Sequence, residues 1–305
     1  MKRRVLLTLI GGTAVAWPVG ICLHRNADWA LLGSYVPLDS LTVVPVSPPA
    51  FTFDDEFTGD LLQWTDHDFW QEPPGYWMED SVQWGPLPAS DSGLAVVASG
   101  VLSLKTLFLN HPNGAAICGV ELTTRNSFAT FVHGSIDGRF QIPGNAQAWP
   151  AFWLLGNGQW PASGEIDIFE FVNNGSQNGI PFFSLHWAAS TAGPDARTWA
   201  DTASWKYQSP APLPNYTIGW HIWHVERTSD YIKVWIDGTL WSQVLRSDLA
   251  PIGGNFDVIF NEPMHIRVTM SSGANAVGNW AYDPNHAAAE GTFQIDYIRV
   301  QSAAP

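Results

Sequence analysis

The chain has 305 residues, 46% of them hydrophobic, and a net charge of −14 with only 14 lysines and arginines. This length allows one large core, such as a single all-β domain of roughly 200–250 residues. The acidity disfavours nucleic acids and heavily sulfated glycans as partners, because such polyanions would be repelled. Seventeen tryptophans suit a neutral polysaccharide, whose sugar rings stack on aromatic side chains, although about half of these residues are expected in the core.

The N-terminal residues predict export. Residues 1–30 open with three basic residues and continue into an apolar stretch, which is typical of a secretory signal peptide or an uncleaved N-terminal anchor. We therefore expect a secreted or extracytoplasmic protein, with a membrane tether if the segment is not cleaved. Residues 31–50, rich in proline and valine, are expected to be a linker, and residues 51–302 a single domain.

Short apolar runs between glycine, proline and aspartate predict many strands in this domain. Residues 53–57 are predicted as an edge strand, and the last strand, 293–300, should return to pair near it. Residues 60–90, where four tryptophans lie among prolines and glycines, are predicted as a long loop with a binding or lid role. Further strands are expected at 94–98, 101–107, 121–124, 134–142, 256–260 and 265–270, the first two as a hairpin about Ser99 and Gly100.

Residues 220–227 and 231–238 alternate well between apolar and polar side chains. They are predicted as a hairpin closed by an Asp-Gly turn. The first of these strands carries His221 and His224, but an offset of three places two side chains on opposite faces of a strand. A metal site at this pair is therefore rejected.

Two tryptophans precede the most acidic part of the chain. Trp149 and Trp153 are four residues apart and so share a strand face, and Ala151 between them leaves room for a sugar ring. A pair of core tryptophans is the alternative. Stacking on a sugar in a cleft is favoured because the acidic strand follows closely.

Residues 163–171 carry the strongest chemical signal, since three carboxylates lie there in a run of Ile and Phe. Strand side chains alternate between faces, so Glu165 and Asp167 share one face. Glu170 would point the other way unless a β-bulge near Phe169 inserts one residue, and bulges are frequent beside active sites. With a bulge, the strand presents a row of three acids; the alternative is a strand whose acids are merely solvated.

Two glutamates in such a row have the chemistry of a retaining glycosidase. Their Cα atoms would lie roughly 13 Å apart, and side chains that lean inward would bring the carboxyl groups to about 5–5.5 Å. One carboxylate attacks the anomeric carbon, and the other, kept protonated, donates its proton to the leaving oxygen. Clustered like charges raise at least one pKa, which allows a glutamic acid to hold a proton near neutral pH.

The acidic stretch and its surroundings resemble glycoside hydrolase family 16. The pattern Glu-x-Asp-x-x-Glu, at Glu165, Asp167 and Glu170, is similar to the catalytic signature of that family in its bulged form. Residues 138–144 and 149–156 resemble the laminarinase branch. The similarity runs in the expected order over nearly the whole chain after residue 50.

The resemblance implies a fold and an activity. The fold would be an all-β, concanavalin-like jelly-roll sandwich of two antiparallel sheets with a concave cleft. The protein would be a monomeric, retaining endo-glycosidase that cleaves internal β-1,3 bonds of a neutral laminarin-type glucan without a cofactor. Glu165 would be the nucleophile, Glu170 the general acid and base, and Asp167 the residue that tunes the nucleophile. Galactan-active, agar-active or mixed-linkage enzymes of the family, and a non-catalytic β-glucan-binding domain, remain alternatives.

Further substrate contacts are implied by the resemblance. His186 lies on the next strand and resembles the family's active-site histidine, which hydrogen-bonds a carboxylate or a sugar hydroxyl; a satisfied core histidine is the alternative. Trp149 and Trp153 are expected to line the cleft with it. Arg139 and Trp187 are included as substrate contacts, although Trp187 has the opposite parity to His186.

A structural calcium site is also implied by the resemblance. Glu56, Gly100 and Asp296 match positions that hold Ca²⁺ on the convex side of related enzymes. Oxygen ligands suit that ion. Strand acids without a metal are the alternative.

Overall fold

The computed structural model describes residues 51–59, 61, 64–72, 76–78, 94–105, 107–108, 117–144, 148–171, 179–192, 199–208, 214–272 and 291–303. The predicted signal or anchor segment at 1–30 and the linker at 31–50 lie outside these residues. Within the described part of the chain, no helix combines the length and the hydrophobicity needed to cross a membrane.

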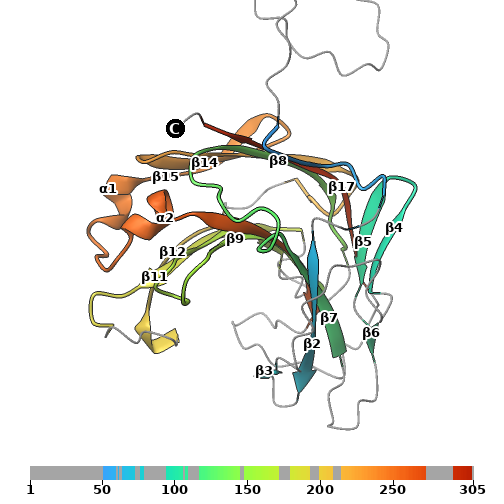
Figure 1. The fold of residues 1–305 in the computed structure, drawn as a ribbon, viewed down its shortest axis with the longest axis horizontal. Helices are drawn as coiled ribbons and strands as arrows, with labels where there is room; N and C mark the ends of the chain where they lie inside the picture. The colour runs from blue at the N-terminus through green and yellow to red at the C-terminus, as the bar shows by residue number, and fades with distance from the viewer. Residues whose placement is uncertain are drawn as a thin grey trace, which may run out of the picture. The chain divides into compact units, whose positions relative to one another are not determined.

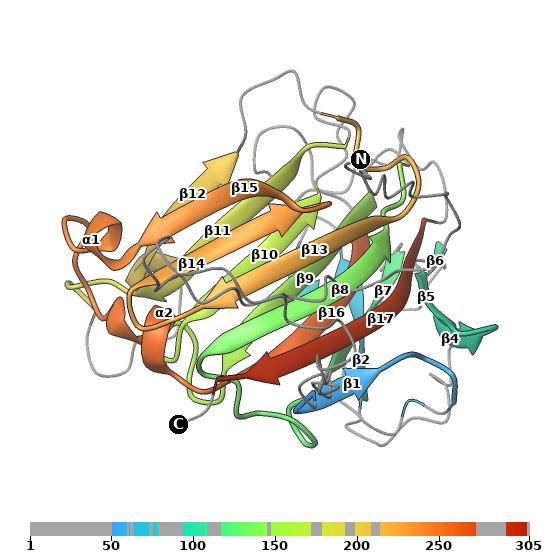
Figure 2. The same ribbon diagram turned by 90° about the horizontal axis from the view of Figure 1, so that it is seen from above.

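Two antiparallel sheets pack face to face over one core, as Figure 1 shows. The eight-stranded sheet has the order β15 (Thr239–Leu245), β14 (Tyr231–Ile236), β13 (His221–Arg227), β8 (Gly134–Gln141), β17 (Thr292–Ser302), β5 (Val101–Lys105) and β4 (Ala95–Ala98), and β1 (Phe53–Asp55) pairs with β17. Seen from above in Figure 2, this sheet lies over the other one.

The nine-stranded sheet carries the acidic stretch. Its order is β12 (Thr202–Gln208), β11 (Pro181–Ala188), β10 (Glu165–Phe171), β9 (Ala148–Gly156), β16 (Met264–Ser272), β7 (Ile117–Thr123), β2 (Thr65–Glu72) and β3 (Tyr76–Met78), and β6 (Leu107–Phe108) pairs with β7. The sheet curves so that its face turned away from the eight-stranded sheet is concave (Figure 1). A 3₁₀ turn (Trp199–Asp201) and two short helices, α1 (Arg246–Leu249) and α2 (Asp257–Asn261), complete the described elements.

Several predicted strands are confirmed. The last strand, β17, pairs with β1 near the start of the domain. The hairpin of β4 and β5 turns at Ser99 and Gly100, with φ of 55° and 74°. Both residues lie in the left-handed region, which matches the right-handed twist of the flanking strands.

Three predictions of local structure are wrong. Residues 60–90 are not one loop, because β2 and β3 form there and extend the nine-stranded sheet. Residues 256–260 are not a strand, because residues 257–260 form most of α2. The Asp-Gly turn at 237–238 closes the hairpin of β14 with β15, while β13 joins β14 through residues 228–230.

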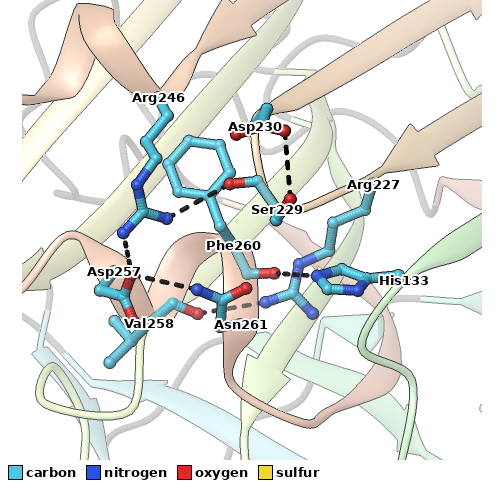
Figure 3. Close-up of polar contacts among 9 residues, drawn as sticks. All are labelled: His133, Arg227, Ser229, Asp230, Arg246, Asp257, Val258, Phe260 and Asn261. Carbon is cyan, nitrogen blue, oxygen red and sulfur yellow. Dashed lines mark hydrogen bonds and ion pairs between the residues drawn. The ribbon is translucent and has the colours of Figure 1, made fainter. Parts of the chain in front are cut away.

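Arg227, at the end of β13, anchors α2 to the sandwich (Figure 3). Its buried guanidinium group donates hydrogen bonds to four carbonyl oxygens, those of Phe131, Val258, Ile259 and Glu262, at 2.9–3.2 Å. The carbonyl groups of a final helical turn have no partner within the helix, and a cation is favourable there. Burial lowers the pKa of Arg227 to about 9, so the group keeps its charge at neutral pH.

Substitution of this anchor should destabilise the fold. In Arg227→Met, four buried carbonyl groups lose their donor, and we expect the free energy of unfolding to fall by about 3 kcal/mol or more. Arg246→Met is the matched control, because Arg246 also contacts α2, through Asp257, but lies at the surface; it should cost less than about 1 kcal/mol. Urea unfolding of both variants measures the difference, and equal losses would contradict the anchoring role.

Candidate active site

The predicted bulge is present in β10. The register with β9 shifts between Asp167 and Phe169, and the register with β11 shifts between Asp167 and Glu170. Ile168 and Phe169 are consecutive, yet both are fully buried. The interrupted alternation returns Glu170 to the face that carries Glu165 and Asp167, on the concave side of the sheet.

The aromatic core explains why the strand bulges at this point. The Phe169 ring lies with its centroid 4.6 Å from that of Trp223 and 5.1 Å from that of Phe140, both on the opposite sheet. Burial of a phenylalanine side chain stabilises the fold by about 1.5–3 kcal/mol. The core therefore accommodates one apolar residue more than regular alternation allows. As a consequence, Glu170 lies on the same face as Glu165 and Asp167.

The three acids have close polar neighbours on the adjacent strands. His186 lies opposite Glu165 in the register of β10 and β11, and its Nε2 is 3.3 Å from Oδ2 of Asp167 and 4.0 Å from Oε1 of Glu165. On the other side, the indole Nε1 of Trp149 donates to Oε1 of Glu170 at 3.1 Å. The structure thus brings His186 and Trp149 to the acids, as predicted.

Burial and like charge act together on Glu165, whose side chain is only 15% exposed. Burial raises its pKa well above the ordinary value, and Asp167 and Glu170 raise it further. His186 and Arg267 act in the opposite direction, because their positive charge favours the carboxylate. The ionisation of Glu165 therefore depends on which cations face it.

Asp167 is subject to the same effects. Burial raises its pKa well above the ordinary value, followed by the charge of Glu170, while Lys206 on β12 and a hydrogen bond with Glu165 lower it. Two neighbouring acids with raised pKa values hold a proton between them at a pH where isolated carboxyl groups are ionised. The row can thus supply both a carboxylate and a protonated acid.

Trp149 and Trp153 lie on the same concave face, half-buried, with Ala151 between them on β9. This excludes the alternative of two core tryptophans. Trp153 lies opposite Asp167 in the register, and its Nε1 donates to Oγ1 of Thr269 at 2.9 Å. Stacking of a sugar on either ring stays a prediction.

Two predicted substrate contacts are wrong. Trp187 is fully buried in the core, where its Nε1 donates to the carbonyl oxygen of Gly253 at 2.7 Å, because it has the opposite parity to His186. Arg139 lies on β8 of the other sheet and faces away from the core, where it pairs with Asp296 at 2.6 Å and stacks on Trp220. Trp187 is absent from the concave face because strand alternation turns it into the core. Arg139 is absent because it belongs to the other sheet.

The residues of the predicted calcium site are engaged otherwise. Oε1 of Glu56 lies 2.5 Å from Nε of Arg299, and Asp296 pairs with Arg139. Gly100 forms the turn between β4 and β5. Because a guanidinium group already neutralises each carboxylate, the donor set does not fit a calcium ion in this arrangement.

Sequence reasoning missed the polar residues that β7 and β16 add to the concave face. Glu121, Arg267 and Thr269 continue the face that Trp153 occupies. The sequence did contain a pattern that predicts a shared face for Arg267 and Thr269, because β16 alternates regularly and buries Ile266 and Val268 on its other side. Only the order of the strands shows that this face adjoins the acids.

Gly164 allows the catalytic strand to start close to α2. Its φ of +78° lies in the left-handed region, and a Cβ atom there would lie 2.8 Å from Cγ2 of Val258 and 3.3 Å from Cε of Met264. A side chain at Gly164, which immediately precedes Glu165, would therefore push against Val258 and Met264. The α2 helix that Arg227 anchors thus packs directly beneath the first acid of the row.

The chain is similar to known carbohydrate-active proteins. Residues 89–208 match the family model described as "XgeA-like, catalytic GH16 domain". The glucan endo-1,3-beta-glucosidase A1 of Niallia circulans is 27% identical over 81% of this chain and 37% of that protein. The endo-1,3-1,4-beta-glycanase EglC of Rhizobium meliloti is 26% identical over 82% of this chain and 51% of that protein. The chain therefore spans about half or less of the length of these relatives.

The fold is shared with solved structures. The laminarinase catalytic domain of Thermotoga maritima superposes with a TM-score of 0.61, at 20% sequence identity, over 85% of this chain and all of that chain. The predicted jelly-roll sandwich of two antiparallel sheets is thereby confirmed.

The space around Gly164 can be tested by two alanine substitutions. Gly219 has a similar φ, +86°, but a Cβ atom at this glycine would have no neighbouring atom within 4 Å. We expect Gly219→Ala to cost about 1–2 kcal/mol of stability from backbone strain alone, and Gly164→Ala roughly 2–4 kcal/mol because overpacking adds to the same strain. Thermal unfolding of both proteins measures this, and equal losses would show that the close approach to α2 is unimportant.

The raised pKa values predict a pH-dependent effect of Glu165→Gln on stability. The folded state holds protons that the unfolded chain releases, so wild-type stability falls as the pH rises from the ordinary glutamate pKa through the raised one. Removal of one acid relieves this loss. The variant should melt at a higher temperature than wild type at pH 7 and at a similar temperature near pH 4; a lower melting temperature at pH 7 would contradict the electrostatic account.

Proposed function

We propose that the chain belongs to glycoside hydrolase family 16, whose catalytic-domain model matches residues 89–208, and that the protein is a retaining endo-β-1,3-glucanase that acts on laminarin-type glucans. The observation that carries the proposal is the bulge in β10, which brings Glu165, Asp167 and Glu170 to one concave face. The acidity of the chain supports a neutral polysaccharide as substrate. The activity for which the Niallia circulans relative is named supports the β-1,3 linkage.

The first step forms a bond between Glu165 and the sugar. A carboxylate oxygen of Glu165 attacks the anomeric carbon while the bond from that carbon to the bridging oxygen breaks. Glu170, protonated at this stage, donates its proton to that oxygen, and the chain beyond the cleaved bond leaves as an alcohol. The result is a covalent glycosyl–enzyme.

The second step restores the enzyme. Glu170, now a carboxylate, takes a proton from a water molecule, and the water oxygen attacks the anomeric carbon. The bond to Glu165 breaks, and Glu165 returns to its ionised form. Two inversions at the same carbon leave the original anomeric configuration.

The neighbours of the acids support these roles. Asp167 hydrogen-bonds Glu165 and contacts His186, so it holds the nucleophile in place and shares its proton. The hydrogen bond from Trp149 fixes the Glu170 carboxyl group, which must first donate and then accept a proton. Trp149 and Trp153, with small Ala151 between them, provide aromatic surfaces for sugar rings on the side of β9.

A mixed-linkage β-glucanase is the second candidate. It is favoured by the EglC relative, which is matched over 82% of this chain and is named for both 1,3 and 1,4 linkages. Galactan- or agar-active enzymes share the same acid pair and stay as further alternatives. Release of reducing ends from laminarin, lichenan, agarose and carrageenan distinguishes these substrates, and binding to laminarin without turnover would indicate a glucan-binding domain.

We also propose that the protein is exported. The support is the basic start of residues 1–30 and the apolar stretch that follows. The segment is either cleaved, which gives a secreted enzyme, or retained as a membrane tether.

The two glutamates should differ in their chemical rescue. Glu165→Ala and Glu170→Ala should each lower laminarin turnover by about 1,000-fold or more, because each loses one of two essential carboxyl groups. With an activated aryl glycoside, azide should restore both variants. The product of Glu165→Ala should be the α-glycosyl azide and that of Glu170→Ala the β-glycosyl azide, as identified by NMR.

The matched control for this experiment is Glu226→Ala, on the eight-stranded sheet, which should keep wild-type turnover. Full activity of Glu165→Ala would refute the mechanism, and the same anomer from both rescued variants would refute the division of roles.

A further inference from the structure

The concave face carries an ion pair that the proposed mechanism does not use. Arg267 on β16 lies opposite Trp153 of β9 in the register, and its guanidinium carbon is 4.6 Å from the centroid of the Trp153 ring. Its Nη2 is 2.7 Å from Oε1 of Glu121 on β7. The two charged side chains are only 12% and 9% exposed, so the pair is largely removed from water.

The same group of residues fixes Trp153 at two points. Arg267 covers one face of the ring, and the indole Nε1 donates to Thr269. The hydroxyl group of Thr269 in turn donates to Oε2 of Glu121 at 3.4 Å. Glu121 therefore contacts both Arg267 and Thr269, the two residues that fix Trp153. Because Arg267 covers one face of the indole ring, a sugar can stack only on the other face.

The arrangement places a cation on the same face as the catalytic acids, with one strand between them. Register pairing puts Arg267 next to Trp153, and Trp153 next to Asp167, in one row across β16, β9 and β10. Charge on a guanidinium group acts strongly where the surroundings exclude water.

We propose that Arg267 is a positioning residue, which fixes the Trp153 ring beside the catalytic acids and adds a positive charge on the β16 side of the acidic row. Glu121 sets the strength of this effect, because it neutralises part of that charge. The inference rests on the proposed function, which makes Glu165 the nucleophile.

The other charges near Glu165 come from its own strand and from β11 and β12. Asp167 and Glu170 on β10 oppose its ionisation, and His186 on β11 favours it. Lys206 on β12 acts on Asp167. The effect of these groups on Glu165 is the same in the wild-type protein and in variants of Arg267 on β16 or Glu121 on β7.

On the opposite side, β9 presents the uncharged side chains of Trp149, Trp153 and Leu155. On β16, His265 lies fully buried, and burial together with Arg267 and Arg125 lowers its pKa to about 3. It is therefore neutral in the working range. Among the side chains that the structure describes, Arg267 and Glu121 remain as the charged pair on this side of the acids.

Two substitutions should change the titration of Glu165 in opposite directions. Arg267→Gln removes the cation and should raise the titration midpoint of the Glu165 carboxyl group by roughly 0.5–1 pH unit. Glu121→Gln leaves the cation without its counter-charge and should lower the midpoint. Arg267→Lys keeps the charge and should stay nearer to wild type than Arg267→Gln does.

The measurement is a pH titration by NMR of protein labelled with ¹³C in the glutamate side chains, with the Glu165 signal assigned from Glu165→Gln. Arg139→Gln is the matched control, because Arg139 has the same kind of partners, Asp296 at 2.6 Å and Trp220 at 4.8 Å, on the opposite sheet. It should leave the Glu165 midpoint unchanged.

An unchanged midpoint in Arg267→Gln, or shifts of the same sign in Arg267→Gln and Glu121→Gln, would overturn the proposal. The second outcome is what a merely structural role predicts. If Arg267→Gln does not fold, the direction of the shift in Glu121→Gln decides, because no shift or a rise would equally overturn it.

The titration is independent of any substrate, so it separates this inference from the proposed function. A wild-type protein that cleaves no glucan would refute the function and leave the midpoints as a test of the charge effect. In an active enzyme, the acidic limb of kcat/KM should move with the midpoint in each variant, since that limb reports the ionisation of the nucleophile in the free enzyme.

Discussion

The site depends on the burial of two consecutive apolar residues, Ile168 and Phe169. A regular strand would send one of them to the concave face and Glu170 into the core. An unpaired carboxylate in an aromatic core costs several kcal/mol, whereas the Phe169 ring is stabilised there by the rings around it. The bulge resolves this conflict. The hydrophobic effect in the core is thus what assembles the acids on the other side of the same strand.

The proximity and burial of the acids disfavour their ionisation. Burial and mutual repulsion raise the pKa values of Glu165 and Asp167, which suits a site that must hold a proton but opposes a nucleophile that must ionise. Positive charge from the flanking strands sets the balance. In a chain with 14 basic residues against 28 acidic ones, Arg267 and Lys206 are placed where their charge reaches these acids.

Elements of the opposite sheet contribute to the site without reaching the concave face. Arg227 on β13 binds the carbonyl groups of α2, and α2 packs on Gly164 at the start of β10. Trp223 of the same strand packs on Phe169 at the bulge. Both ends of the acidic stretch are therefore supported through the core.

The sequence alone was sufficient for the acidic row and its bulge, because alternation along one strand is a local property and the spacing of Glu165, Asp167 and Glu170 is unusual. It also predicted the face of Trp149 and Trp153. It wrongly predicted two substrate contacts. Arg139 lies on a different sheet, and Trp187 directly follows His186 and therefore points to the opposite face, into the core. Which strands become neighbours is decided by pairing between distant segments, and no local pattern encodes it. Only the tertiary structure could therefore place β16 beside β9, and with it a cation one strand away from the strand that carries the acids.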